Sequence, residues 1–165
     1  MALIHRIAKP NELDIAFSLL KEAALWLKEK HIDYWQNWID PPQYYREWIY
    51  DGFQHNEFRF VYDNDDLVGM YRLQSNDEKF WGKREDKAGY IHSFTTKREY
   101  YSKGIGHNIL NEIEIKLKAE KIKYLRLDCG SKNKELCSYY EHYGFLRVGE
   151  IELDGTKQSL YEKRI

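Results

Sequence analysis

The period of the hydrophobic positions changes early in the chain. Residues 2–8, ALIHRIA, have the composition of a short strand. Hydrophobic side chains then recur every three or four residues, which predicts an amphipathic helix. These positions are Leu13, Phe17, Leu20, Ala24 and Leu27. Asn11, followed by Asp14, is typical of a capped helix start. The pattern breaks in the stretch HIDYWQNWIDPPQ, and a second short helix is predicted to end at Gly52.

Alternating hydrophobic and polar positions follow in the centre of the chain. Residues 57–63 and 66–74 alternate as strands do, and the Asx-rich turn between them predicts a hairpin. Residues 75–86, SNDEKFWGKRED, are polar enough to suggest an exposed loop. Residues 88–96, AGYIHSFTT, are expected to form a fourth strand.

The last third of the chain returns to the helical period and then alternates again. A helix from Gly104 to about Glu120 is predicted because isoleucine and leucine form one stripe. This stripe consists of Ile105, Ile109, Ile113 and Leu117. Residues 123–129 are expected to form a strand, and Asn133 and Gly144 should begin and end a short helix. Two final strands are joined by a turn at Asp154 and Gly155.

The order of these elements predicts one α/β (α+β) domain over residues 1–165. Antiparallel strands should form most of a mixed sheet with helices on both faces. One strand–helix–strand crossover joins the fourth and fifth strands, which should therefore be parallel.

Composition narrows the classes of function. The formal charge is −1, which argues against a nucleic-acid partner. No stretch has the length of a membrane span and the N-terminus lacks a signal-peptide pattern, so we expect a cytoplasmic protein without a membrane partner. Cys129 and Cys137 lack metal-ligand spacing, so reduced thiols and no metal site are expected.

Two glycines, Gly104 and Gly106, lie where the chain enters the long helix. Such a turn can pack a helix tightly against a sheet, or its amides can hold a phosphate group. The residues after the glycines do not fit a P-loop, and Ile109 occupies the position of the third glycine in a dinucleotide fingerprint. The turn alone therefore leaves both interpretations open.

Two motifs together resemble the GNAT family of N-acetyltransferases. The family signature Gln/Arg-x-x-Gly-x-Gly/Ala is matched by residues 101–106, YSKGIG, except that Tyr101 replaces Gln or Arg. The second signature, an Asn followed by Tyr-x-x-x-Gly-Phe, is matched by Asn133 and by residues 140–145, YEHYGF. The resemblance is strongest over residues 88–150 and implies a GNAT-like fold.

The resemblance implies acetyl-CoA as cofactor and CoA as product. The pyrophosphate would rest on the amides of the glycine turn from Lys103 to His107. The cofactor-binding residues of this turn are Tyr101, Ser102, Lys103, Gly104, Ile105, Gly106 and His107. The pantetheine would pair with the backbone of Phe94, Thr95 and Thr96. Asn133 would hold the cofactor backbone or a water, or would cap its helix. Tyr101 brings no charge to this site.

The implied reaction is direct attack of a small-molecule primary amine on the thioester. Tyr140 matches the family tyrosine that protonates the leaving thiolate, with Tyr139 as the neighbouring alternative. His92 resembles the histidine base of aralkylamine acetyltransferases. Structural roles compete with both assignments, because Tyr140 could pack its helix on the sheet and His92 could be hydrogen-bonded within the sheet.

Aromatic side chains gather in the loop between the first two helices. Trp35 and Trp38 lie near Asp33 and Asp40, so they could hold a cationic amine or could fill the core over the first helix. A non-catalytic CoA-binding sensor or interaction module of the same fold is the alternative function, favoured by Tyr101. Edge strands of the sheet could pair between two copies of the chain, so a homodimer is possible.

Overall fold

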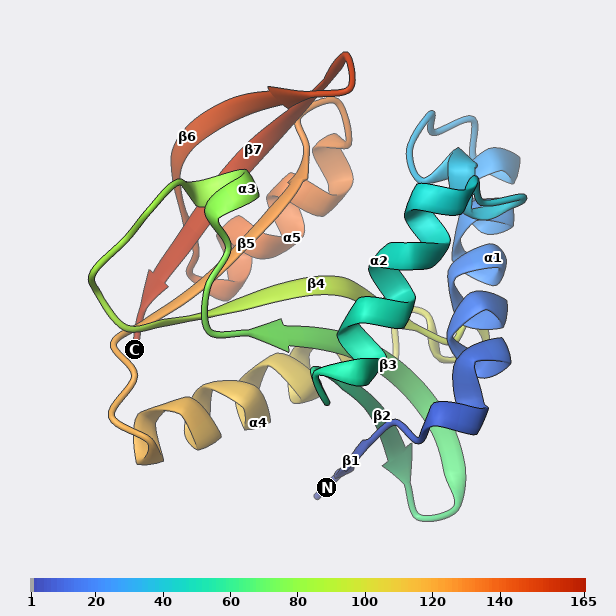
Figure 1. Ribbon diagram of the computed structural model, residues 1–165, viewed down its shortest axis with the longest axis horizontal. Helices are drawn as coiled ribbons and strands as arrows, with labels where there is room; N and C mark the ends of the chain where they lie inside the picture. The colour runs from blue at the N-terminus through green and yellow to red at the C-terminus, as the bar shows by residue number, and fades with distance from the viewer. Residues whose placement is uncertain (1) are drawn as a thin grey trace. The chain divides into compact units, whose positions relative to one another are not determined.

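The computed structural model describes residues 2–165, which form seven strands, five α-helices and three short 3₁₀ turns (Figure 1). The strands are β1 (Ile4–Ile7), β2 (Phe58–Asp63), β3 (Asp66–Gln74), β4 (Ala88–Thr96), β5 (Tyr124–Gly130), β6 (Leu146–Leu153) and β7 (Thr156–Arg164). The α-helices are α1 (Leu13–Glu29), α2 (Gln43–Gln54), α3 (Glu78–Trp81), α4 (Ile105–Ala119) and α5 (Lys134–Tyr143). The 3₁₀ turns are η1 (Pro10–Glu12), η2 (Gln36–Trp38) and η3 (Arg98–Tyr100).

The strands form a single mixed sheet in the order β1-β2-β3-β4-β5-β7-β6. Strand β4 pairs with β5 in parallel, while the pairs β1–β2, β2–β3, β5–β7 and β6–β7 are antiparallel. The predicted fold class and the β4–α4–β5 crossover are thereby confirmed. In the part of the chain that the structure describes, no helix combines the length and the apolar character needed to cross a bilayer.

The chain divides into two compact units. The first contains the residues up to Arg72 together with Ser93–Leu110. Its core lies where α1 packs on the β2–β3 hairpin, because the helical stripe meets the inward side chains of both strands. The buried residues of this core include Leu19, Leu20, Ala24, Phe58, Phe60 and Met70.

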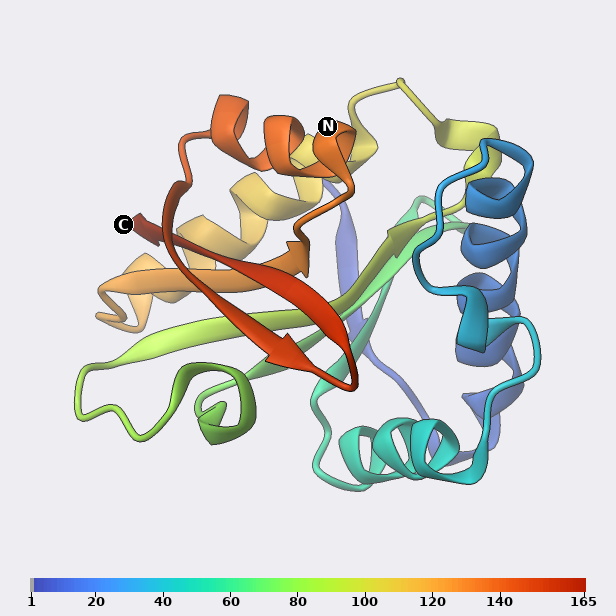
Figure 2. The same ribbon diagram turned by 90° about the horizontal axis from the view of Figure 1, so that it is seen from above.

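The second unit contains Leu73–His92 and Asn111–Ile165. Strands β6 and β7 form a long hairpin in this unit (Figure 2), and β7 pairs with β5. A smaller core includes Trp81, Tyr90 and Leu160. Beside this core, the buried guanidinium of Arg126 donates hydrogen bonds to Asp86, Glu162 and Tyr90. The strand that carries Arg126, β5, is thus held by polar as well as apolar contacts.

The sequence pattern and the structure differ at three places. The polar stretch predicted as an exposed loop contains α3, whose Trp81 is buried. Helix α1 begins at Leu13, after η1. The side chain of Glu12, rather than that of Asn11, accepts a hydrogen bond of 2.7 Å from the Lys9 N–H. Helix α2 continues two residues beyond Gly52.

Candidate active site

The turn that joins β4 to α4 belongs to the first unit, and its backbone is accessible to solvent. Residues 101–104 are exposed. Gly104 has φ +79°, a conformation that favours glycine, and a Cβ placed there would meet no atom within 4 Å. Gly104 therefore leaves room for a ligand directly above the backbone.

The amides of this turn are only partly available. The Lys103 N–H donates to the Tyr100 carbonyl at 3.1 Å, which removes one of the donors expected for the anion site. The first hydrogen bond of α4 runs from the Asn108 N–H to the Gly104 carbonyl at 3.0 Å. The amides of Ile105, Gly106 and His107 therefore precede the helical ladder, where amides point outward along the helix axis. These three amides are the best candidates for holding a phosphate.

Tyr101, the departure from the family motif, packs against α1. Its ring lies 4.8 Å from the ring of Trp26, measured between centroids. The guanidinium of Arg98 lies 5.2 Å from the same indole and donates from Nε to the Thr96 carbonyl at 3.1 Å. Burial lowers the pKa of Arg98 from its ordinary value. Tyr101 and Arg98 thus fasten the turn to α1, and Thr96 already has a partner for its carbonyl.

Strand β4 changes its course at Ser93. Its parallel pairing with β5 ends at Ile91 and Leu127. Ser93 has φ +50°, which is unusual for a non-glycine residue inside a strand and locally redirects the backbone. Of the three residues expected to pair with pantetheine, Thr95 is buried, and Phe94 and Thr96 are half-buried.

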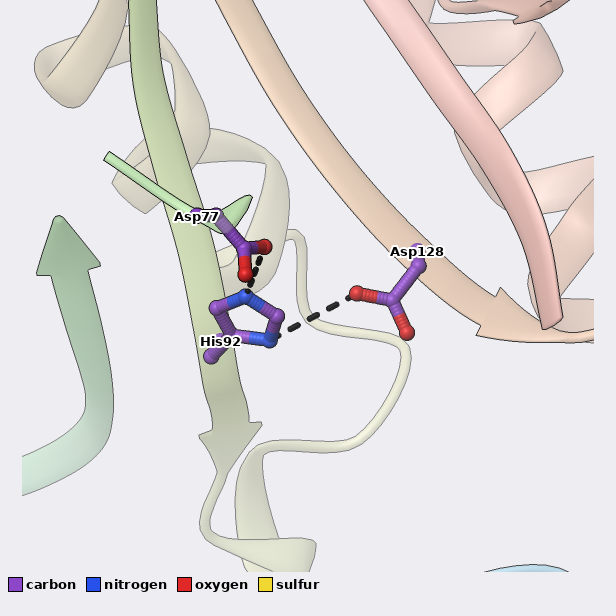
Figure 3. A group of neighbouring side chains, drawn as sticks. All are labelled: Asp77, His92 and Asp128. Atoms are coloured by element: carbon purple, nitrogen blue, oxygen red, sulfur yellow. Dashed lines mark hydrogen bonds and ion pairs between the residues drawn. The ribbon is translucent and has the colours of Figure 1, made fainter. Parts of the chain in front are cut away.

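In the second unit, the imidazole of His92 lies between two carboxylates (Figure 3). Its Nε2 is 2.7 Å from Asp77 Oδ2, and its Nδ1 is 3.5 Å from Asp128 Oδ1. The side chains of His92, Asp77 and Asp128 are only 9%, 4% and 8% exposed. A titratable ring is therefore largely shielded from water and lies between two carboxyl groups.

Sheet register and a helix cap bring these three side chains together. Ile91 pairs with Leu127, so the next residues on the parallel strands, His92 and Asp128, are neighbours. Asp77 is the N-cap of α3 and accepts the Phe80 N–H at 3.4 Å. Neither carboxylate is among the site residues predicted from the sequence. The signal for Asp77 was a capping residue just before two aromatic side chains, in a stretch interpreted as a loop.

Asp128 is held in an unfavourable environment for a charged carboxylate. Burial is the main reason why its pKa rises to about 6, and the nearby charge of Asp77 adds to the rise. Proximity to His92 acts in the opposite direction. Within residues 2–165, Asp128 Oδ1 has no hydrogen-bond partner. Asp128 can therefore gain or lose a proton close to neutral pH.

We expect Asp128→Asn to stabilise the protein at neutral pH. The folded-state pKa of about 6 exceeds the unfolded value of about 3.9, so the folded state binds the proton more tightly. This contribution to stability is present below about pH 4 and is lost as pH rises through 6. The loss amounts to about 2–3 kcal/mol, and the variant should not show it.

Chemical denaturation at pH 4 and pH 7 measures this difference. The variant and the wild type should have similar free energies of unfolding at pH 4 and should diverge at pH 7. Asp154→Asn, at an exposed turn position, is the matched control. Equal stability of the Asp128 variant and the wild type at pH 7 would contradict the expectation.

The two residues of the second family motif lie on and before α5. Tyr140 is 5% exposed, and its ring meets those of Phe145 and Tyr139 edge-on, with centroids 5.7 and 5.5 Å apart. Burial raises the pKa of Tyr139 to about 12. Asn133 caps α5, because its Oδ1 accepts the Leu136 N–H at 3.2 Å. The cap predicted for Asn133 is confirmed, and Tyr140 has the packing role that competed with catalysis.

The two tryptophans of the predicted acceptor loop have different surroundings in the first unit. Trp38 is buried in the core and meets Tyr45 edge-on at 4.9 Å. Trp35 is half-buried and stacks on Tyr34 at 5.8 Å. A hollow of about 400 Å³ lies beside Trp38 and is lined by groups of both charges, including Asp14, Lys21, Asp40 and Arg46.

Comparison with known proteins places the chain in a family. The family model of the acetyltransferase (GNAT) family matches residues 15–145. A GNAT acetyltransferase from Listeria monocytogenes is 22% identical, with coverage of 99% of this chain and 95% of the other and a TM-score of 0.78. The PaiA N-acetyltransferase from Thermoplasma acidophilum, solved with coenzyme A, is also 22% identical, with full coverage of both chains and a TM-score of 0.72.

A third solved structure is a GNAT acetyltransferase from Elizabethkingia anophelis with acetyl-CoA bound. It is 18% identical, covers 99% of this chain and 97% of its own, and has a TM-score of 0.63. No curated protein sequence matches the chain. Since the family model covers most of the chain and includes the glycine turn, His92 and Tyr140, this protein belongs to the acetyltransferase (GNAT) family.

Proposed function

We propose that the protein transfers an acetyl group from acetyl-CoA to a primary amine of a small molecule, with CoA as the second product. The observation that carries this proposal is the buried imidazole of His92, held between two carboxylates. An N-acetyltransferase needs such a group, because an amine must lose a proton to become a nucleophile. Family membership and the cofactors bound to two similar structures support the proposal.

We assign the cofactor to the turn between β4 and α4. The open space above Gly104 and the amides of Ile105, Gly106 and His107 fit a pyrophosphate group. Backbone groups of Phe94 and Thr95 remain the candidates for pantetheine. Thr96 is the weaker candidate, because Arg98 already donates to its carbonyl.

The proton chemistry is assigned to two side chains of the second unit. Bound acetyl-CoA supplies the acetyl group as an activated thioester. His92 takes a proton from the ammonium form of the acceptor, and the amine nitrogen then forms its bond to the acetyl carbon. Tyr140 gives a proton to the sulfur as the carbon–sulfur bond breaks, and the second proton that the nitrogen loses as the amide forms restores the phenol of Tyr140. The products are an amide and the free thiol of CoA.

A small acceptor is proposed because the predicted acceptor loop borders a hollow of about 400 Å³. Its lining combines carboxylates and cations, so the hollow suits a compact molecule with more than one polar group. The release of thiol, measured with a panel of compact amines and polyamines, tests the acceptor class.

The alternative function, a non-catalytic CoA-binding module, was favoured by Tyr101. Tyr101 has a structural role on Trp26, so its presence does not itself indicate a loss of catalysis. Burying a histidine between two carboxylates has an unfavourable desolvation free energy. A non-catalytic sensor has no need for such a group, whereas an acetyltransferase uses it to take a proton.

Gly104→Val should weaken binding of CoA and acetyl-CoA at least tenfold, which corresponds to about 1.4 kcal/mol. Valine is strained at φ +79°, and its side chain would fill the open space above the turn. Isothermal titration calorimetry measures the affinity. Gly155→Val is the matched control, because Gly155 has φ +75° and equally open surroundings in the β6–β7 turn. If wild-type protein bound neither ligand at high micromolar concentration, the cofactor assignment would be wrong.

A further inference from the structure

We infer that Asp77 and Asp128 are positioning residues that control the proton handled by His92. Asp77 fixes which ring nitrogen carries a proton, and Asp128 shares a proton with the other nitrogen. This inference rests on the proposed function, in which His92 accepts the proton of the acceptor amine.

Asp77 determines the tautomer through its two oxygens. Oδ1 accepts the Phe80 N–H, and Oδ2 lies 2.7 Å from His92 Nε2. An ionised carboxylate can only accept hydrogen bonds, so Nε2 must be the donor in this contact. The imidazole therefore carries a proton on Nε2, and its basic lone pair is on Nδ1.

Nδ1 faces Asp128. The distance of 3.5 Å to Oδ1 exceeds a usual hydrogen bond by a few tenths of an ångström, so a small approach of the two groups would connect them. Asp128 Oδ1 is buried without a hydrogen-bond partner among residues 2–165. After such an approach, Nδ1 would satisfy this oxygen whether the proton lies on the ring or on the carboxyl group.

The cluster of Asp77, His92 and Asp128 can exist in two states of net charge. With ionised Asp77, a proton between Nδ1 and Asp128 gives either imidazolium with carboxylate or neutral imidazole with carboxylic acid. Both forms have a net charge of −1, because moving the proton from the ring to the carboxylate neutralises one positive and one negative charge. Loss of this shared proton leaves a net charge of −2 and a basic Nδ1. The observed titration then belongs to the cluster rather than to a single residue.

Two elements supply the carboxylates that face His92. Asp77 reaches His92 from the start of α3, and Asp128 reaches it from β5. The ring of Phe80 lies 4.8 Å from the imidazole. The neighbouring thiol of Cys129 has a raised pKa because of burial, so it stays neutral beside Asp128 at physiological pH.

Asp77→Asn should move the proton to the wrong nitrogen. The Phe80 N–H needs an acceptor, so the amide oxygen of Asn should occupy the place of Oδ1. The amide NH₂ then faces Nε2, which must become an acceptor, and the ring proton moves to Nδ1. A ring protonated on Nδ1 cannot take a proton from the acceptor amine at that atom.

Nitrogen-15 NMR of the histidine rings, with no substrate present, tests the tautomer. We expect wild-type His92 to keep its Nε2 proton throughout a titration from pH 5 to 9. Asp77→Asn should show the Nδ1-protonated ring at neutral pH, and Asp128→Asn should retain the Nε2 tautomer. His55, an exposed histidine 3.3 Å from Asp51, provides the reference for a histidine–carboxylate pair at the surface. Wild-type His92 lacking the Nε2 proton, or an unchanged tautomer in Asp77→Asn, would overturn the inference.

The pH–rate profile gives the second readout. Asp77→Asn should lower the rate about a hundredfold. Asp128→Asn should shift the acidic limb by about one pH unit towards lower pH, because the imidazolium loses a facing carboxylate. Wild-type profiles in both variants would exclude the positioning roles. A wild-type protein that releases no thiol with any amine would reject the proposed function, whereas the NMR titration would still decide where the proton lies.

Discussion

His92→Gln is expected to lower kcat/KM for amine acetylation by about 10²- to 10³-fold near pH 7. The glutamine amide can still donate to Asp77, so the variant should keep the packing around α3 while losing the base. The defect should shrink as pH approaches the pKa of the acceptor amine, near 10 for an alkylamine, because a neutral amine no longer needs a base. Thiol release measured from pH 6 to 10 at saturating acetyl-CoA follows this change.

His142→Gln is the matched control for this experiment. His142 also lies in the second unit, but it is exposed and its Nδ1 contacts the Ser138 carbonyl on α5. Its replacement should leave the whole pH–rate profile unchanged. A rate deficit in His92→Gln that is equal at every pH would count against a role in proton removal and would point to a structural defect.

Tyr140→Phe should lower kcat about a hundredfold with little effect on the KM for acetyl-CoA. Phenylalanine keeps the edge-on contacts with Phe145 and Tyr139 and lacks the phenol hydroxyl that acts as proton donor. The thiolate must then leave without a proton, which makes breaking of the carbon–sulfur bond more difficult. Steady-state kinetics with varied acetyl-CoA separate the effects on kcat and KM.

Tyr139→Phe serves as the control for Tyr140, because Tyr139 is the adjacent and more exposed tyrosine of α5. We expect wild-type rates for this variant. If Tyr139→Phe lost activity while Tyr140→Phe retained it, the acid would have to be reassigned to Tyr139. Thermal unfolding of both variants checks that the aromatic packing around Phe145 is intact.

The sequence pattern was sufficient for most elements of the fold. Strands β3 and β4 have the bounds that alternation predicted, because each stretch ends at polar or turn residues. The Asn133 cap and the Gly144 end of α5 follow equally local rules. Such signals depend on one residue and its nearest neighbours, so they can be recognised without knowledge of the tertiary structure.

The candidate site could be predicted only in part. His92 and Tyr140 were found through motif resemblance, but the partners of His92 depend on contacts that are distant in sequence. Asp128 becomes its neighbour through the register of β4 on β5, which hydrophobic alternation does not determine. Asp77 becomes a partner of His92 because it caps α3, a short helix in the polar stretch whose Trp81 is buried.

The structural role of Tyr101 also could not be predicted from sequence patterns. Its contact with Trp26 depends on which face α1 turns toward the glycine turn. From the motif alone, a tyrosine at this position appears only as the loss of a charge. With the contact known, it is a packing residue that holds the turn in place.

The burial of Asp128 has a consequence for protein engineering. A search for heat-tolerant variants should repeatedly select neutral residues at this position, because they remove a charge that the folded state accommodates poorly. The same variants would give His92 a weaker hold on its proton. Variants selected for thermostability at position 128 should therefore also transfer acetyl groups with an acidic limb moved towards lower pH.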